Sequence, residues 1–249
     1  MLKIDYMLGF GGGSAKDNTG AVNFDGNTWL SRGADLTSVP STNYWTYSFW
    51  YKFDSTTDTT VYENSIEKVV FFNTYVWQIE SKSPDTVNIG YEGLDTDVTN
   101  WHHTCGMVNT GSANDSHYYR DDTEITAGSR AGNYDGSNYN LSSANHFLFK
   151  AGGPGADARQ FEGSIYEFWM VWGQNIDLTN TTTRRKFISA DLKPVALGAN
   201  GETPTGTSPE IYMTGGAASF ATNLGTGGAF TVGSGALIET GKPTTAGAP

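Results

Sequence analysis

The chain has 249 residues, of which 37% are hydrophobic, 13% aromatic and only 16% charged. This length is enough to bury one substantial core, and the aromatic share excludes a disordered chain. The net charge of −11 repels phosphate backbones and anionic lipid headgroups, so we expect neither nucleic acid nor a membrane surface as a partner. Membrane insertion is not expected either, because no stretch approaches the roughly 18 apolar residues of a membrane-spanning helix.

The N-terminal segment, residues 1–20, combines a short apolar run with a cluster of glycines between Gly9 and Gly13. It lacks the cleavage site and the uninterrupted apolar run of a signal peptide, so we expect the protein to be made in a cytoplasm. Glycine clusters act as flexible joints. We therefore predict an N-terminal arm whose apolar side chains make assembly contacts, namely Leu2, Ile4, Tyr6, Leu8 and Phe10.

Runs of aromatic and β-branched residues follow, separated by turn dipeptides, and they predict β-strands. In residues 44–53 the aromatic residues at odd positions share one face, and residues 69–79 form another apolar run. Residues 165–172 are apolar on both faces except at Glu167, which predicts a strand that is covered on both sides. With 31 glycines in the chain, this pattern predicts an all-β, two-sheet antiparallel sandwich of the jelly-roll type.

One short helix is expected within residues 179–188, where polar capping residues come first and Arg184, Arg185 and Lys186 come last. This order of polar and basic residues matches the helix dipole. We interpret the basic triplet as a solvated helix end, with a patch that binds an anionic ligand as the alternative.

The C-terminal segment, residues 196–249, is rich in Gly, Thr and Ala and has only short apolar islands. Such a segment buries little by itself, so we expect it to become ordered against the main domain or a neighbouring subunit. The predicted organisation is an arm over residues 1–20, a jelly roll over residues 21–195 and an extension over residues 196–249.

Three sequence blocks, taken in order, resemble the laminin-G-like branch of the concanavalin-A-like jelly rolls. They are residues 21–29 (AVNFDGNTW) with 47–52 (YSFWYK), residues 100–104 (NWHHT) with 118–124 (YYRDDTE), and residues 161–168 (FEGSIYEF). The resemblance spans about residues 21–190. It implies two antiparallel sheets with one short helix.

The same blocks suggest roles for single residues. Trp50 and Trp101 are expected to fill the space between two facing sheets, and Gly163 to allow a close backbone approach. His102 and His103 are adjacent in a predicted strand and so point to opposite faces, which prevents them from chelating one metal together. Cys105, the single cysteine of the sequence, is interpreted as a small buried residue rather than as a reactive thiol.

The C-terminal extension has a narrower resemblance. Residues 204–213 and 223–233 look like the C-terminal run of laminin-G-like structural proteins of tailed bacteriophages. This resemblance implies a non-enzymatic virion protein, either a capsid decoration protein or a tail or fibre component, made in the host cytoplasm. Such a protein docks on other virion subunits and on copies of itself, with host-surface glycans as an optional further partner.

Some relatives with this fold are glycoside hydrolases, whose carboxylates alternate on one strand face in a Glu-x-Asp-x-x-Glu pattern. The chain lacks that pattern. Glu162 and Glu167 are five residues apart and therefore face opposite sides of a regular strand. No catalytic residue is predicted, and a glycoside hydrolase is the least favoured of the functions considered.

Calcium is an open alternative, because many laminin-G-like domains bind it in a loop at the rim of the sandwich. Calcium needs several oxygen ligands from converging loops. Asp25 and Asn27 are the candidate ligands, and both are equally suited to a turn. No other cofactor is expected.

A candidate glycan site lies in residues 133–140, where aromatic rings and amide groups are mixed. Rings suit stacking on a sugar and amides suit hydrogen bonds to its hydroxyl groups, whereas the alternative is a polar hairpin loop. The candidate residues are Tyr134, Asp135, Asn138 and Tyr139. A second candidate aromatic patch, for a sugar or for a neighbouring subunit, consists of Trp29, Tyr44 and Trp45. These features favour, as the alternative function, a lectin-like adhesin that binds host-surface glycans with or without calcium.

Overall fold

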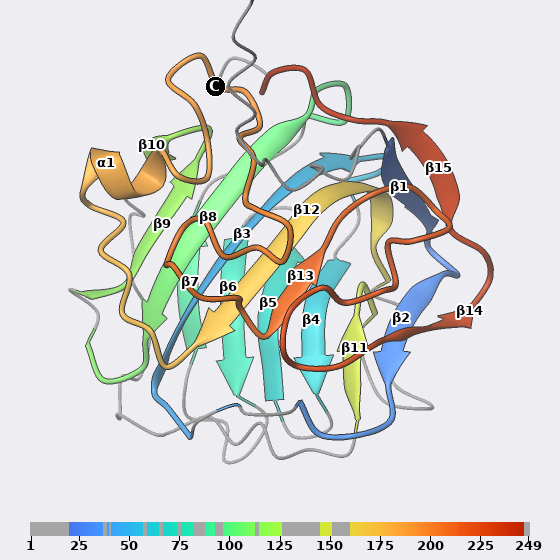
Figure 1. The fold of residues 1–249 in the computed structure, drawn as a ribbon, viewed down its shortest axis with the longest axis horizontal. Helices are drawn as coiled ribbons and strands as arrows, with labels where there is room; N and C mark the ends of the chain where they lie inside the picture. Colours follow the sequence, from blue (N-terminus) through green and yellow to red (C-terminus); the bar gives the residue numbers. More distant parts are fainter. Residues whose placement is uncertain are drawn as a thin grey trace, which may run out of the picture.

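The computed structural model describes residues 20–36, 39, 41–56, 59–64, 67–73, 76–81, 88–92, 97–112, 115–125, 145–150 and 160–246. These residues form two antiparallel β-sheets that pack face to face, with one short helix beside them (Figure 1). The all-β, two-sheet sandwich that the sequence predicts is therefore confirmed. Within the described part of the chain, no helix is long and apolar enough to cross a membrane.

The sheet nearer the viewer in Figure 1, here called the front sheet, runs in the order β10-β9-β8-β3-β12-β1-β15. Strand β12 pairs with β1 along its first half and with β13 along its second half. The front-sheet strands are β1 (Gly20–Asp25), β3 (Tyr44–Phe53), β8 (His102–Asn109), β9 (His117–Arg120), β10 (Thr123–Glu124), β12 (Glu162–Trp172), β13 (Ile211–Met213) and β15 (Ile238–Gly241).

The second sheet, here called the back sheet, runs in the order β14-β2-β11-β4-β5-β6-β7. Its edge strand β14 and the front-sheet edge strand β15 both come from the C-terminal extension and lie on the same side of the molecule (Figure 1). The back-sheet strands are β2 (Trp29–Arg32), β4 (Thr59–Asn64), β5 (Glu67–Asn73), β6 (Val76–Ser81), β7 (Asn88–Glu92), β11 (His146–Leu148) and β14 (Thr231–Ser234).

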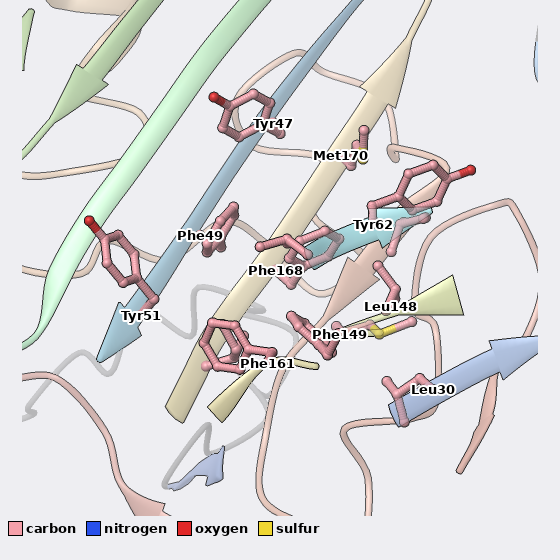
Figure 2. Close-up of a cluster of buried hydrophobic side chains, with 14 of the residues drawn as sticks. Leu30, Tyr47, Phe49, Tyr51, Tyr62, Leu148, Phe149, Phe161, Phe168 and Met170 are labelled. Atoms are coloured by element: carbon pink, nitrogen blue, oxygen red, sulfur yellow. The ribbon is translucent and has the colours of Figure 1, made fainter. Parts of the chain in front are cut away.

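Aromatic side chains that alternate along the strands fill the space between the sheets (Figure 2). Tyr47, Phe49 and Tyr51 of β3 belong to this cluster, and each is at most 2% exposed. Phe168 of β12 meets Phe49 with the two ring centroids 5.3 Å apart, a usual spacing for packed aromatic pairs. The aromatic residues that the alternation in residues 44–53 places on one face therefore point into the core between the sheets.

The outer face of the front sheet is apolar too, and the chain that follows β12 covers it. Trp169 of β12 lies in one cluster with Phe187 and Tyr212, and its ring centroid is 5.1 Å from that of Phe187. The Trp169 indole N–H donates a hydrogen bond to the Gly201 carbonyl oxygen at 2.8 Å. The strand over residues 165–172 is thus covered on both sides, as its apolar pattern predicts.

Trp50 lies on this outer face, which corrects the prediction that it fills the space between the sheets. It is 1% exposed and clusters with Ile188 and Ala246. Because successive side chains of a strand alternate, Trp50 must face away from its neighbour Phe49, whose ring lies in the core. Trp101 packs against the same outer cluster as a partly buried residue. Both tryptophans therefore connect the front sheet to the chain that covers it.

Helix α1 (Thr181–Arg184) is part of this covering chain and lies at one side of the front sheet (Figure 1). Asn180 caps its first turn, because the side-chain oxygen accepts a hydrogen bond from the Thr182 N–H at 2.9 Å. The polar start of the predicted helix is confirmed.

The basic end of this helix is solvated at Lys186, as predicted, but not at Arg184, which corrects that part of the prediction. Arg184 is only 8% exposed, and its guanidinium donates a hydrogen bond to Asp122 at 2.7 Å while lying 4.3 Å from the ring centroid of Tyr119. Arg185 donates to the other carboxylate oxygen of Asp122. These contacts hold the covering chain on the turn between β9 and β10.

Gly163 lies where β12 approaches β3 closely, as its sequence context predicts. Its φ is +153°, and a Cβ at this position would overlap the carbonyl oxygen of Lys52 in β3. Any side chain at this position would therefore push the two central strands apart.

We expect Gly163→Ala to lower the free energy of unfolding by roughly 2–4 kcal/mol, because the added methyl group meets backbone rather than a movable side chain. Chemical denaturation measures this change. Gly33→Ala is the matched control, since a Cβ at Gly33 meets no atom within 4 Å. A Gly163→Ala variant as stable as the Gly33→Ala variant would contradict the close approach.

A second prediction concerns Asp122. Burial alone would raise the pKa of its carboxyl, but hydrogen bonds from Arg184 and Arg185 hold it below the ordinary value of 3.8. We expect Asp122→Asn to lower the free energy of unfolding by about 2 kcal/mol near neutral pH, because Arg184 loses its counter-charge. Since the folded-state pKa is lowered, this contribution is complete above the unfolded-state pKa and disappears as the pH falls through the folded-state value.

Urea denaturation of the parent and of Asp122→Asn at several pH values tests this. The difference between them should be constant above about pH 5 and shrink below about pH 4. Asp191→Asn, which changes an exposed carboxylate in the turn after α1, is the control and should match the parent. A constant difference down to the lowest pH at which the protein folds would contradict the assigned ion pair.

Candidate functional site

A β-bulge interrupts β12 on the outer face of the front sheet. Tyr166 pairs with Trp50 and Trp169 pairs with Ser48, so β12 holds one residue more than β3 over this stretch. Glu167 lies in the bulge with a φ of +53°, a left-handed conformation that costs a residue other than glycine about 1–3 kcal/mol. The extra residue shifts the alternation of the strand, and Glu167 lines a hollow on the outer face.

This hollow, here called the Glu167 pocket, has a volume of about 660 Å³. Outward-facing residues of β12 and β13 line one side, and the other is lined by residues 193–199, which lead into the extension, and by residues 242–244 of the extension. In Figure 1 this part of the extension crosses in front of the sheet. The volume is within the range of small-molecule sites, about 300–1,000 Å³.

Buried polar groups line the Glu167 pocket. Glu167 is 3% exposed, and its carboxylate accepts a hydrogen bond from the Tyr166 hydroxyl. Burial raises the pKa of Tyr166, and the Glu167 carboxylate raises it further, so this hydroxyl stays protonated. Thr214 also lines the pocket, but its hydroxyl oxygen is buried from solvent and has no hydrogen-bond partner among the described residues. Polar groups buried in this way normally have a partner.

Charged side chains border the same pocket. Lys193 and Lys242 are exposed lining residues. Glu202 is held by the backbone, because its carboxylate accepts a hydrogen bond from the Asn200 N–H at 2.8 Å. Backbone hydrogen bonds of this kind keep the pKa of Glu202 below its ordinary value. The acidic group at the rim is therefore ionised and tied to the protein.

The lining combines Tyr166, which is 5% exposed, with the buried carboxylate of Glu167, whereas the Tyr212 ring is fully buried. Aromatic rings offer apolar contact, and the polar groups fix the orientation of a ligand by hydrogen bonding. The pocket is therefore suited to a small ligand that carries both an apolar face and several hydroxyl groups.

The residues that the sequence predicts for glycan binding and for assembly lie outside the described residues, so both sets stay predictions. The glycan set is Tyr134, Asp135, Asn138 and Tyr139, and the assembly set is Leu2, Ile4, Tyr6, Leu8 and Phe10.

The aromatic patch predicted at Trp29, Tyr44 and Trp45 is wrong. Trp45 is fully buried between the sheets. Trp29 lies on the back sheet with the Lys150 ammonium group 3.9 Å from its ring centroid. The alternation of β3 explains the difference, because Trp45 shares the core face with Tyr47.

Asp25, one of the two candidate calcium ligands, lies in the turn between β1 and β2. Its Oδ1 accepts hydrogen bonds from the Asn27 N–H at 3.0 Å and from the Thr28 hydroxyl at 2.9 Å. These bonds lower the pKa of Asp25. In the part of the chain that the structure describes, no three His, Cys, Asp or Glu side chains group together as metal ligands. Calcium binding at Asp25 and Asn27 stays a prediction.

The remaining sequence candidates are structural. Cys105 is 1% exposed and burial raises the pKa of its thiol to about 12, which confirms it as a buried core residue. The His102 ring lies 2.6 Å from the Asp121 carboxylate, and burial lowers the pKa of His103 to about 3. His103 is therefore neutral within the outer layer.

Comparisons with known proteins rest on structure, because no family model and no curated protein matches the sequence. A heptameric SAP-like pentraxin from Limulus polyphemus is similar, with a TM-score of 0.53 and 11% identity over 91% of this chain and 96% of that chain. A protein of Bacteroides ovatus assigned to carbohydrate binding has a TM-score of 0.53 and 12% identity over 92% of this chain. The match spans 61% of the Bacteroides protein.

These likenesses establish the fold. The chain is a jelly roll of two antiparallel sheets, a fold that it shares with the pentraxin and with the Bacteroides protein. At 11% and 12% identity the neighbours carry no residue-level correspondence to the Glu167 pocket. The case for function therefore depends on the pocket itself.

Proposed function

We propose that this chain is a non-enzymatic, lectin-like carbohydrate-binding protein and that its Glu167 pocket holds a sugar ring. The observation that carries the proposal is a pocket of about 660 Å³ on the outer face of the front sheet, in which Tyr166 and apolar residues lie beside the carboxylate of Glu167. A sugar ring carries C–H groups on its faces and hydroxyl groups around its edge, so its recognition uses both kinds of contact.

In this proposal the Glu167 carboxylate accepts hydrogen bonds from ligand hydroxyl groups. The left-handed backbone at Glu167 supports this role, because strained conformations of this type cluster at functional sites. The carbohydrate binding for which the Bacteroides protein is named agrees with the proposal at the level of fold.

The proposal is binding without catalysis, because the sequence lacks the Glu-x-Asp-x-x-Glu pattern of the glycoside hydrolases that share this fold. Release of reducing ends from a polysaccharide by the purified protein would overturn this part of the proposal.

Binding of the purified protein to an array of defined glycans, with calcium and with a chelator, tests the proposal. We expect binding to a subset of glycans, and Glu167→Gln should weaken it by about tenfold or more, since a charged acceptor becomes a neutral amide. Glu124→Gln is the matched control, because Glu124 of β10 pairs with His117 of β9 and does not line the pocket.

Two further variants separate this pocket from the site predicted from sequence. If Tyr134→Ala or Tyr139→Ala abolishes binding while Glu167→Gln leaves it intact, the sugar binds at the loop of residues 133–140 instead. If no glycan on the array binds, the carbohydrate proposal is wrong.

For the setting in which the protein acts, we propose the virion of a tailed phage, with docking on other virion subunits or on copies of itself. Exposed apolar side chains at the sheet edges support a docking role, since Val232 of β14 is 39% exposed and Ile238 of β15 is 53% exposed.

We expect removal of residues 1–20 to abolish incorporation into particles and to leave the unfolding midpoint unchanged. Full occupancy of the truncated protein on particles would contradict docking through the arm.

A further inference from the structure

A row of side chains crosses the outer face of the front sheet beside the Glu167 pocket. Lys52 of β3 pairs with Ser164 of β12, Ser164 pairs with Asn23 of β1, and Asn23 pairs with Ile238 of β15. Trp101 extends the row on the other side, because it directly precedes the strand that pairs with β3. Paired residues lie next to one another across strands, so these side chains form one band.

This band lines a second hollow of about 470 Å³, here called the Trp101 hollow. The neighbouring row on the same face contains Trp50 and Tyr166, which Ile188 and Ala246 cover. The covering chain thus closes over the apolar row and leaves the polar row open.

The side chains in the Trp101 hollow differ in kind from the apolar row. Trp101 is a partly buried aromatic residue, and the rest of the lining is polar or charged apart from Ile238 and Gly241. The Asn23 amide donates hydrogen bonds to the Asp54 carboxylate at 2.6 Å and to the Ser164 hydroxyl at 3.2 Å. The amide is therefore fixed in orientation, and its carbonyl oxygen is placed among other hydrogen-bonding groups. One aromatic platform with oriented polar groups matches the needs of a sugar ring.

The two hollows are adjacent. Lys242 lines both of them. Ser164 of the Trp101 hollow and Tyr166 of the Glu167 pocket are two residues apart on one face of β12, which is about 7 Å along a strand. Neighbouring rings of one saccharide chain can therefore reach both hollows.

We propose that the Trp101 hollow is a second sugar subsite, so that the ligand is an oligosaccharide of at least two linked rings. One ring occupies the Glu167 pocket, and the next lies on Trp101 across the row of Asn23, Ser164 and Lys52. This inference rests on the proposed function, because the first ring must bind in the Glu167 pocket.

Affinity for saccharide ladders of one to four rings, prepared from cellulose, chitin, polygalacturonate and alginate, tests the inference in calorimetric titrations. We expect the affinity for one series to rise by about tenfold or more from one ring to two or three. Trp101→Leu should remove this gain and leave the affinity for the single ring unchanged. Glu167→Gln should weaken every member of the series.

Trp29→Leu is the matched control, since it removes a partly buried tryptophan from the back sheet. If Trp101→Leu does not fold, Thr240→Trp replaces it, because Thr240 is a partly exposed residue of β15 that lines the hollow and a large ring there blocks it. If the affinity is the same for one ring and for longer chains, the second subsite is wrong. It is also wrong if the gain in affinity survives in Trp101→Leu or in the variant that replaces it. Neither result bears on binding in the Glu167 pocket. Absence of binding by every ladder and every array glycan overturns the proposed function itself.

Discussion

The front sheet has two apolar faces, and the need to cover both of them is the constraint on which the rest of the structure depends. In β3, Tyr47, Phe49 and Tyr51 occupy the core face and Trp50 the outer face. Packing against a second sheet covers only the inner faces. The outer layer comes from the chain after β12, which is rich in glycine and threonine and is ordered here because the outer aromatic side chains provide a surface to bury.

Hollows form where this outer layer does not follow the sheet. At Glu167 the bulge adds a residue that neither the regular pleat nor the covering chain accommodates, and a pocket opens above it. At the row that contains Ser164, the outward side chains are polar and gain little from being covered, so the layer leaves them open. The two hollows therefore have separate physical causes, although they are neighbours on β12.

Local patterns were sufficient for much of the fold and for little of the site. The alternation in residues 44–53, the apolar run of residues 165–172 and the glycine at Gly163 each depend on close neighbours, and each prediction is confirmed. The predicted position of Trp50 between the sheets was wrong, because alternation fixes which residues share a face of a strand but not which face meets the second sheet. Glu167 was visible as the acidic residue in an apolar strand, yet the bulge that turns it outward arises from pairing with β3.

The segment that completes the fold also completes both hollows. Their walls come partly from the front sheet and partly from residues 193–199 and 238–244 of the extension. The end of that extension is fastened by the Ala246 N–H, which donates a hydrogen bond to the Leu192 carbonyl oxygen at 2.7 Å. A ligand that touches both walls binds only the state in which the extension is docked, and it stabilises that state by mass action. Affinity for a ligand and stability of the outer layer therefore depend on the same contacts.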